Sequence, residues 1–560
     1  MTADIETRRE ALRQSFPVWR AHTLAEWLDI CAGRYGNRPL VLTDHAQLSY
    51  AEVAEDSKRL ADGFAALGIG PGDRIGMIMA NYPQFVAVKF AIARVGAIAV
   101  PINFFYRRDE LGYLLSDSGC RLLVTMTSFR GLDYQSMLDE MLPGWASPRS
   151  KKGCQVVLFD TDSPARPGCL TLAGVAALGR QNRGAADAFV ADPDNACDML
   201  YTSGTTGSPK GVLVTHDAVL RTAYASALTR AYEDGRRILF SLPCYHMFAY
   251  IEGLLSVMFP GGAIIPQTAF SAEGYFAGIE RHRASDMLCV PTMAVAMVES
   301  AARRDYDLSS LRAILCGSAP APIWLWQRIE EEFSVREIVT GYGMTECGGA
   351  MTLTRPEDPL YLTSETAGKP KIAGAASVRG SEALVVYKAV HPETGEDLPI
   401  GDEGELVSRG PTVMLMYWDR PDETAAILRD GWLFSGDLGR VRTDGYLEVT
   451  GRSKELYKSG GELVMPKEIE DVLAAHEEIS QAFAVGLVDD RWGEIGCVVV
   501  VPVPDAALTE SDVLEICRAR LARFKVPKRV VFCHAEDLPT TPTGKVQKYR
   551  LVQQLTSMAR

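Results

Sequence analysis

The stretch YTSGTTGSPKG, residues 201–211, combines three glycines, five serine or threonine hydroxyls, one proline and one lysine. Three interpretations fit it. It could be a surface turn, because Gly, Pro, Ser and Thr favour turns for steric reasons. It could be a P-loop, but that pattern requires G-x-x-x-x-G-K-[ST], whereas Lys210 stands between Pro209 and Gly211. It could also be a different phosphate loop, in which backbone N–H groups, hydroxyls and Lys210 face an anion. The stretch alone leaves all three open.

Other polar residues gather where apolar strands are expected to end. Ligand sites of open α/β sheets lie at the carboxyl ends of their strands, so these clusters are candidates for one common site. The clusters are GYGMTE (341–346) after the apolar EIVT, FSGDLG (434–439) with Asp437 in a tight turn, LPCYHMFAY (242–250) with His246 beside aromatic residues, and PTGKVQK (542–548) with Lys545 in a glycine turn.

The elements that must position these residues alternate in type. Apolar strands and amphipathic helices follow one another from residue 74 to residue 126, and this β-α-β-α-β order predicts a parallel sheet covered by helices. The segments are the strands 74–80, 97–103 and 120–126 and the helices 82–96 and 107–119. The alternation resumes after the glycine-rich stretch, at residues 237–243, 287–292, 312–320 and 337–346.

The pattern changes after about residue 375. Residues 381–390 and 401–410 are expected to be strands of a small, mostly antiparallel, barrel-like unit. A polar junction at 451–460 precedes a tail of about 100 residues that mixes strands and helices, including a helix that begins at Pro466. We therefore expect an α/β protein with a large N-terminal domain, 1–451, and a smaller, mobile α+β domain, 452–560.

Composition limits the function further. The 560 residues carry 58 basic and 71 acidic side chains, a formal charge of −13, which argues against a nucleic-acid partner. None of the 12 cysteines stands at C-x-x-C spacing, and several lie in apolar runs, so we expect reduced thiols in the cytoplasm and no zinc site. The charged N-terminus is not a signal peptide, and no apolar run is long enough to span a membrane.

Taken together, the motifs resemble the adenylate-forming superfamily, in particular the AMP-forming acyl-CoA synthetases of the fatty-acid–CoA ligase type. YTSGTTGSPKG, GYGMTE, GWLFSGDLG, GRSKELYKSGGELVMPKEIE and PTGKVQK occur in the family's order over residues 201–548. The resemblance implies an ATP-dependent, two-step reaction. A carboxylate attacks the α-phosphate of ATP and pyrophosphate leaves; the small domain then rotates, and CoA attacks the acyl carbon.

The resemblance also implies roles for individual residues toward ATP. The first motif would hold the β- and γ-phosphates, Glu346 would bind Mg²⁺, and Thr345 would contact the α-phosphate. Tyr342 would lie against adenine, Asp437 would accept hydrogen bonds from the ribose, and Arg452 would reach the ribose or phosphate. The phosphate-loop residues are Thr202, Ser203, Gly204, Thr205, Thr206, Gly207 and Lys210. The nucleotide is expected to be lined further by Gly317, Ser318, Ala319, Pro320, Gly341, Gly343 and Met344.

Lys545 would be the catalytic cation, because an ammonium between the carboxylate and the α-phosphate brings two anions together and stabilises the charge that develops. Taken alone it would be an ordinary exposed lysine. Lys454 would be the hinge, and His246 would form the wall of the acyl pocket near the path of the thiol, although a packed core histidine is the alternative. The expected contacts to CoA are Gly460, Gly461, Trp492 and Phe524.

The acid is predicted from the composition of the pocket. The segment after His246 has no aspartate to bind an α-ammonium group, and Glu252 is the only nearby carboxylate, so an amino acid is disfavoured. We expect a bulky or extended apolar acid: a medium- or long-chain, ring-bearing or terpenoid- or steroid-like one. The expected wall comprises His246, Phe248, Tyr250, Ile251, Met293, Gly317, Gly341, Gly343, Met344, Gly348, Gly349 and Met351.

The acceptor and the assembly stay open. CoA is the default, and a separate carrier protein or another nucleophile is the alternative; the protein is expected to be a monomer or a homodimer. A non-catalytic nucleotide-binding protein would be expected to lack Lys545, Glu346 or Asp437, and all three are present. A P-loop ATPase would release ADP and phosphate instead of AMP and pyrophosphate.

Overall fold

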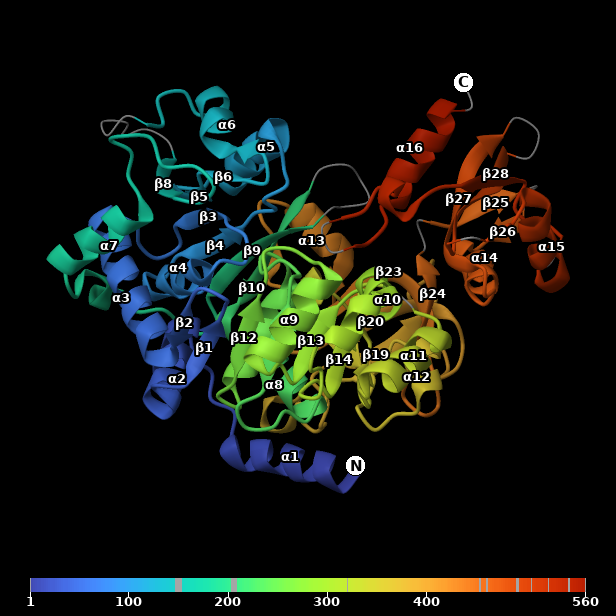
Figure 1. Ribbon diagram of the computed structural model, residues 1–560, viewed down its shortest axis with the longest axis horizontal. Coiled ribbons are helices and arrows are strands. Elements are labelled where there is room, and N and C mark those ends of the chain that lie inside the picture. The colour runs from blue at the N-terminus through green and yellow to red at the C-terminus, as the bar shows by residue number, and fades with distance from the viewer. Residues whose placement is uncertain are drawn as a thin grey trace.

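A computed structural model gives the arrangement of the chain (Figure 1). It describes residues 2–146, 154–202, 209–319, 321–452, 455–459, 462–489, 493–504, 506–521, 523–541 and 544–558. Within these ranges, the sheets fall into a large group formed by residues up to 452 and a small group formed by later residues (Figure 1).

Two seven-stranded sheets form the large group. The first is parallel except for its edge strand β2, in the order β15-β14-β13-β11-β12-β1-β2. Its strands are β1 (Pro39–Leu42), β2 (Gln47–Ser49), β11 (Arg237–Phe240), β12 (Ala263–Pro266), β13 (Asp286–Cys289), β14 (Ala313–Cys316) and β15 (Glu337–Val339). Apart from the edge strand β2, these strands are short and almost entirely buried, as expected for a sheet covered on both faces.

The second sheet has the order β21-β10-β9-β4-β3-β5-β8. It contains β3 (Arg74–Ile78), β4 (Ile98–Pro101), β5 (Leu122–Met126), β8 (Gln155–Phe159), β9 (Ala196–Thr202), β10 (Lys210–Thr215) and β21 (Met416–Tyr417). The expected β-α-β-α-β segment is confirmed: β3, β4 and β5 pair in parallel. β9 and β10 pair antiparallel and flank the glycine-rich stretch, so the ends of this stretch are fixed by a hairpin.

Helices cover these sheets. The helices of the large group are α1 (Thr2–Ser15), α2 (Leu24–Tyr35), α3 (Tyr50–Ala66), α4 (Pro83–Arg94), α5 (Arg108–Ser118), α6 (Tyr134–Met141), α7 (Leu172–Gln181), α8 (His216–Thr229), α9 (Ala272–His282), α10 (Pro291–Glu299), α11 (Ile323–Phe333), α12 (Leu360–Glu365) and α13 (Pro421–Ile427). Several begin with a capping side chain; Thr23 and Ser49, for example, form capping boxes with Glu26 and Glu52.

Two smaller antiparallel sheets follow, and the second of them is the unit that the change of pattern after residue 375 predicts. β16 (Gly341–Met344), β17 (Gly349–Leu353) and β18 (Lys369–Pro370) form one. β19 (Val386–Val390), β20 (Gly404–Arg409), β22 (Leu428–Arg429), β23 (Trp432–Val441) and β24 (Leu447–Arg452) form the other. A two-stranded ribbon, β6 (Ser128–Phe129) and β7 (Leu132–Asp133), completes the large group.

One local expectation is wrong. Asp437 does not lie in a tight turn but inside the long strand β23. The strand bulges there, because a step of two positions on β20, from Glu405 to Val407, faces a step of four positions on β23, from Leu438 back to Phe434. Gly436 allows the bulge with a φ of 72°. The bulge directs Asp437 inward, where only 2% of the residue is exposed.

The small group is built on β25 (Tyr457–Ser459), β26 (Glu462–Val464), β27 (Ile479–Asp489), β28 (Gly493–Pro502) and β29 (Arg529–Phe532), with α14 (Pro466–Ala474), α15 (Glu510–Arg520) and α16 (Lys548–Met558). Its two apolar clusters share no residue with those of the large group. The small group lies beside the large group, at the upper right of the view, and α16 forms the left side of the small group (Figure 1). The expected mixed α/β fold class is confirmed, whereas the domain boundary stays a prediction.

No helix in the described ranges is long and apolar enough to cross a membrane. All 12 cysteines are free, and nine of them are buried. Burial raises the pKa of several of these thiols, for example that of Cys347 to about 12, so they are protonated at neutral pH.

Candidate active site

Asp437 is the centre of a polar cluster contributed by three strands. Tyr342 of β16 donates its hydroxyl to Asp437 Oδ2 at 2.5 Å, and Arg452 Nε at the end of β24 lies 2.8 Å from Asp437 Oδ1. The pairing of Asp437 with Arg452 across β23 and β24 fixes this contact. Burial, and then the Asp437 carboxylate, raise the pKa of Tyr342 well above its usual value, so its hydroxyl stays a donor. The cluster presents an aromatic ring, a carboxylate and a guanidinium to one place.

Glu346 lies on the other side of the β16–β17 hairpin, just after Thr345, in a short 3₁₀ turn. Tyr417 donates its hydroxyl to Glu346 Oε1 at 2.7 Å, and Met414 N donates to the backbone oxygen of Glu346 at 2.8 Å. Burial raises the pKa of Glu346, and the nearby Arg452 opposes this shift. In the described part of the chain, no hydrogen bond to Glu346 Oε2 is formed, so this oxygen is available to a cation.

Lys545 reaches this site from the small group. Desolvation, and then the repulsion from Arg452, lower the pKa of its ammonium to about 8, and Asp437 opposes the shift. Desolvation, and then the field of Lys545, lower the pKa of His246 to about 4, so His246 is neutral. These effects indicate that Lys545 lies near His246 and near the paired residues Asp437 and Arg452, although these groups come from three distant segments of the chain.

The turn that carries Lys545 is seated on the large group. Gly544 has a φ of 76°, and a Cβ placed on it would come within 2.9 Å of Val290 Cγ2. Val290 follows β13 and precedes α10, at the carboxyl edge of the first sheet. Lys545 N donates to Thr541 Oγ1 at 3.0 Å, which closes the turn. The small group therefore contacts the large group at the turn that carries Lys545.

The ends of the glycine-rich stretch lie close to Glu346. Lys210 of β10 forms an ion pair with Glu423 of α13, and its ammonium lies 5.1 Å from the centre of the Tyr417 ring. β10 also pairs with β21, which carries Tyr417. Lys210 therefore lies beside Tyr417, whose hydroxyl donates to Glu346. Of the other predicted phosphate-loop residues, Thr202 ends β9, and Ser203, Gly204, Thr205, Thr206 and Gly207 lie outside the described residues.

Known proteins share this arrangement. Residues 28–418 match the AMP-binding enzyme family, and residues 468–545 match the C-terminal domain of AMP-binding enzymes. The chain belongs to the AMP-binding enzyme family. The resemblance read from the motifs is therefore confirmed.

Relatives within the family cover nearly the whole chain. A feruloyl-CoA synthase of Amycolatopsis sp is 33% identical over 504 residues, which is 90% of this chain and 92% of the relative. The 3-[(3aS,4S,7aS)-7a-methyl-1,5-dioxo-octahydro-1H-inden-4-yl]propanoyl:CoA ligase of Mycobacterium tuberculosis is 32% identical over 530 residues, 94% and 98% of the two chains. These relatives confirm the predicted enzyme class, an AMP-forming acid–CoA ligase.

Solved structures of the family share the fold. ATP-bound MatB from Rhodopseudomonas palustris has a TM-score of 0.81 at 25% identity, covering 96% of this chain and 100% of its own. The anthranilate CoA ligase AuaEII has a TM-score of 0.82 at 23% identity, covering 96% and 98%. The second likeness concerns the fold alone.

On the side expected to bind the acid, this AMP-binding enzyme has apolar and small residues. The segment after His246 is an eight-residue π-helix, η2 (Phe248–Leu255), a rare element that is often found at functional sites. His246 Nδ1 accepts a hydrogen bond from Phe248 N at 3.2 Å. A Cβ on Gly317 would lie 3.2 Å from Phe248 Cζ, so the tip of this ring meets the end of β14.

The same helix presents Ile251 to the hairpin. A Cβ on Gly349 would lie 3.6 Å from Ile251 Cγ1 and 3.8 Å from Thr222 Cγ2 of α8, which leaves an apolar surface at Gly349. Met293 and Met351 are buried, and Gly341, Gly343, Met344 and Gly348 belong to the β16–β17 hairpin or its turn. Tyr250 is fully buried, with the Lys89 ammonium 4.7 Å from its ring centre.

Glu252, the carboxylate closest to His246 in the sequence, is already paired. It is fully buried, its Oε1 lies 2.6 Å from Lys371 Nζ, and Ser226 donates to the same oxygen at 3.0 Å. A buried carboxylate bound to a lysine is a poor partner for a second ammonium, because the pair already compensates its charge. This observation supports the prediction against an amino-acid substrate.

Some of the predicted site residues lie at the edge of the site, and others lie outside the described residues. Ser318 and Ala319 are exposed after β14, and Ser318 has an unusual φ of 74°, typical of backbone held for function. Phe524 is half-buried against the apolar cluster of the small group, with the Lys525 ammonium 5.7 Å from its ring centre. Pro320, Lys454, Gly460, Gly461 and Trp492 lie outside the described residues.

One polar cluster was missed by the sequence reasoning. Asp117 of α5 accepts hydrogen bonds from the Tyr201 hydroxyl at 2.7 Å and from Arg420 at 2.6 Å. Tyr113 of the same helix donates to Pro209 O at 3.0 Å. Helix α5 thus contacts the chain on both sides of the glycine-rich stretch. The only available signal was the polar side chains on the face of a predicted helix, which by itself indicates solvent exposure.

Proposed function

We propose that this enzyme activates a bulky apolar carboxylic acid with ATP and transfers the acyl group to CoA. The observation that carries the proposal is the convergence of Lys545 on the cluster of Asp437, Tyr342 and Arg452, beside a wall of apolar residues. The relatives that act on ferulate and on a bicyclic propanoate support a ring-bearing acid. A medium-chain acid is also supported, because the mitochondrial medium-chain acyl-CoA ligase ACSF2 of Danio rerio is 30% identical to this chain over 549 residues.

In this proposal the nucleotide is held by groups that are already in place. Asp437 accepts from the ribose hydroxyls in exchange for its present donors, and the ring of Tyr342 lies against adenine. Gly317, Ser318 and Ala319 form the opposite side. Lys210 leaves Glu423 to contact the β- and γ-phosphates, with Thr202 and the rest of the loop.

Mg²⁺ fits this site. Glu346 offers one free carboxylate oxygen in a buried position, and Mg²⁺ is commonly bound by one or two carboxylates together with substrate phosphates and water. No group of three or more His, Cys, Asp or Glu side chains in the described ranges could hold a metal ion by itself. When bound, the ion neutralises charge on the phosphate oxygens.

Lys545 performs the main electrostatic task. Its ammonium lies between the α-phosphate and the acid, lowers their repulsion, and stabilises the negative charge on the α-phosphate as the carboxylate oxygen attacks. Thr345 contacts the same phosphate. His246 is neutral and lies beside the acyl carbon, where it adds no charge that would compete for the carboxylate.

The second step, transfer of the acyl group to CoA, requires the small domain to move away from the site. We place the domain boundary between residues 451 and 452, with Lys454 as the hinge, so that the small domain carries Lys545 away after adenylation. Gly460, Gly461, Trp492 and Phe524 would then face CoA. Transfer to a carrier protein is the alternative, and the twelve free cysteines support a cytoplasmic location.

The test is pyrophosphate release from Mg²⁺–ATP with a panel of acids, with and without CoA. The panel covers straight chains from short to long, aromatic acids, polycyclic acids and amino acids. Release with polycyclic, aromatic or medium-chain acids, and a thioester when CoA is present, is the expected result. Adenylate without thioester would favour a carrier protein. Pyrophosphate released only with amino acids would contradict the proposal.

A further inference from the structure

A second cavity, which includes Gly431 and Trp432 of the GWLFSGDLG motif, is lined by three arginines. It has a volume of about 590 Å³, within the range of small-molecule sites. It lies between α8, the segment after Ala376, and the antiparallel sheet of β19, β20 and β23. Its walls are Arg221, Ser377, Val378, Arg379, Val386, Arg409, Gly410, Pro411, Gly431 and Trp432.

The strand register builds one wall. Val386 pairs with Arg409, and Ser408 pairs with Leu433, which sets Arg409 beside Trp432. Residues in one such row project from the same face of a sheet. Trp432 also pairs with Arg429 of β22. The register therefore sets Arg409 beside Trp432, whose ring has the Lys388 ammonium 4.3 Å from its centre, whereas the Arg429 guanidinium lies over the ring of Phe434.

The charge of this cavity is unusual for the protein. No carboxylate is among its lining residues, although the whole chain has a formal charge of −13. Arg221 pairs with Asp217 at 2.5 Å and donates to Ala376 O at 2.9 Å. In the described part of the chain, Arg379 and Arg409 form no ion pair, and both are exposed. Two cations are thus free to bind an anion.

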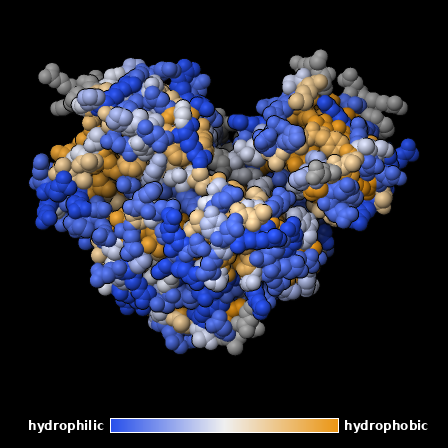
Figure 2. Space-filling view, viewed as in Figure 1, coloured by the Kyte–Doolittle hydropathy of each residue, from blue (hydrophilic) through white to orange (hydrophobic). Residues whose placement is uncertain are grey.

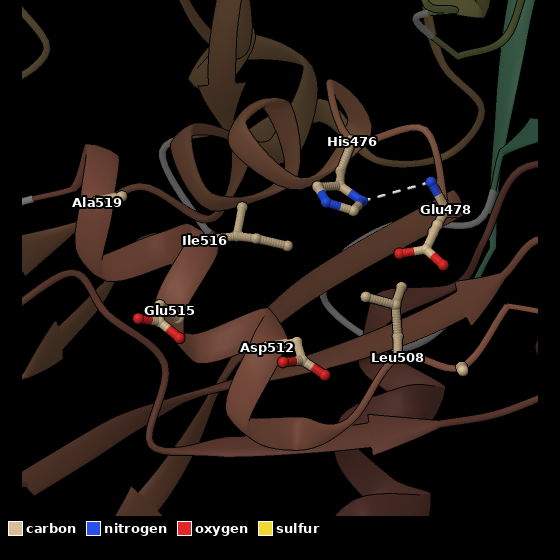
Figure 3. Close-up of a pocket in the computed structure, with 8 residues that line it drawn as sticks. His476, Glu478, Leu508, Asp512, Glu515, Ile516 and Ala519 are labelled. Carbon is tan, nitrogen blue, oxygen red and sulfur yellow. Dashed lines mark hydrogen bonds between the residues drawn. The ribbon is translucent and has the colours of Figure 1, made fainter.

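A cavity of similar size in the small group provides a contrast. It has a volume of about 580 Å³ and lies against α15, with Glu478, Asp512 and Glu515 around His476 (Figure 3). His476 Nδ1 is engaged by Glu478 N at 3.3 Å. Its carboxylates would repel a phosphate. Volume alone therefore does not distinguish the two cavities, whereas the sign of their charge does.

The arginine-lined cavity shares a wall with the active site. Gly410 and Pro411 continue into Thr412, whose backbone oxygen would lie 2.6 Å from a Cβ on Gly348, next to the Glu346 turn. Two residues further, Met414 N donates to Glu346 O at 2.8 Å. A ligand that moves residues 409–411 would therefore act on the segment that holds Glu346.

We propose that this cavity is a second anion site, which takes a phosphorylated compound with a planar ring, of mononucleotide size. Arg379 and Arg409 bind the phosphate, because the guanidinium fork matches two phosphate oxygens. Trp432 provides the aromatic wall for the ring. Since adenylation as proposed above releases AMP, a mononucleotide is formed by the enzyme itself.

The test is the stoichiometry of AMP binding, measured by equilibrium dialysis without acid or CoA. We expect two AMP per chain for the unchanged protein and one for Arg379→Gln/Arg409→Gln. Asp437→Ala weakens the other site, so at AMP concentrations that saturate only the arginine-lined cavity it should also bind one, and the combination of all three substitutions should bind almost none. Adenosine, which lacks the phosphate, should not bind to Asp437→Ala.

Two controls make the result specific. Arg180→Gln/Arg304→Gln removes two exposed arginines that line neither cavity and should still bind two AMP. Glu515→Gln changes the acidic cavity and should do the same. One AMP per unchanged chain, unaffected by Arg379→Gln/Arg409→Gln, would overturn the proposal. Binding needs no catalysis, so this result is separate from the outcome of the acid panel.

Discussion

Asp437 and Lys545 are the two charged groups on which the proposed adenylation depends, and the protein holds them in opposite ways. Asp437 is 2% exposed, lies in the middle of a ten-residue strand, and has two partners within 2.8 Å. Lys545 lies in a short turn of the small group, remains accessible to solvent, and has no carboxylate within 4.0 Å among the described residues. Asp437 is therefore held inside one sheet by fixed partners, whereas Lys545 is contributed by a turn of the small group.

This difference in how the two groups are held suits two separate tasks, nucleotide binding for Asp437 and the chemical step for Lys545. A buried carboxylate that the strand pairing holds in place can receive a nucleotide by exchanging its present donors for the ribose hydroxyls, and this preorganisation favours affinity. A cation that arrives on a separate unit can be withdrawn once its step is complete. Figure 2 shows a concave surface between the two upper lobes of the molecule. The following predictions test this division, from the largest effect to the smallest.

Replacing Lys545 should abolish the first step and spare the second. Lys545→Ala is expected to slow adenylate formation by about 10²–10³-fold, the usual cost of removing one preorganised charge from a transition state. The rate of thioester formation from a supplied acyl-adenylate should change less than about twofold. Lys467→Ala, an exposed lysine paired with Asp471 in the same small group, is the control. Equal losses in both steps would contradict the division.

Replacing Asp437 should act on nucleotide affinity. Asp437→Ala leaves the Tyr342 hydroxyl and Arg452 without their acceptor and removes the proposed ribose contact, a loss of about 1–3 kcal/mol, or roughly 5- to 150-fold in the KM for ATP. Steady-state kinetics at saturating acid measures it. Tyr342→Phe keeps the carboxylate and should have a smaller effect. An unchanged KM with a reduced kcat would assign Asp437 to chemistry instead.

The pH profile should report Lys545. Because its pKa is lowered to about 8, the ammonium is present below this pH and is lost above it. Adenylation should therefore decline as the pH rises through about 8. Arg keeps its charge, so Lys545→Arg should be slower but lose this decline. If both proteins show the same alkaline limb, another group is responsible.

The smallest effect is expected at Asp117, which binds Tyr201 before the glycine-rich stretch and Arg420 beside it. Asp117→Asn should raise the KM for ATP by about 3- to 10-fold, because one charge-assisted hydrogen bond is worth about 1 kcal/mol or more. The kcat should change less. Asp139→Asn, which removes a comparable ion pair with Arg166 on the surface, should leave the KM unaltered.

Much of the fold follows from local patterns. The parallel strands β3, β4 and β5, the antiparallel unit after residue 375 and the helix beginning at Pro466 were all predicted, because periodicity and turn residues are local properties. The bulge that turns Asp437 inward was not, since it depends on how β20 and β23 pair over 30 residues of sequence. Local sequence predicted these elements better than it predicted how Asp437 is held within its strand.

The same limit applies to the site. Glu346, Asp437 and Lys545 were found because they belong to contiguous motifs, whereas Tyr417 and Asp117 act through contacts with residues 71 and 84 positions away. Glu252 could be recognised in the sequence as a carboxylate, but its pairing with Lys371, 119 positions away, could not. Partners separated by such distances depend on the tertiary fold and leave no local pattern.

Gly544 has a consequence for the order of the two proposed half-reactions. Its missing side chain lets the turn approach Val290 closely enough for Lys545 to reach the nucleotide, and a single added carbon would meet Val290 Cγ2 at 2.9 Å. In the proposed reaction this fit would act as an interlock, because the space that the turn fills is closed to an incoming thiol while the turn is seated there. The order of the two proposed half-reactions would then follow from shape, and a reactive mixed anhydride would be exposed to its acceptor only after it has formed.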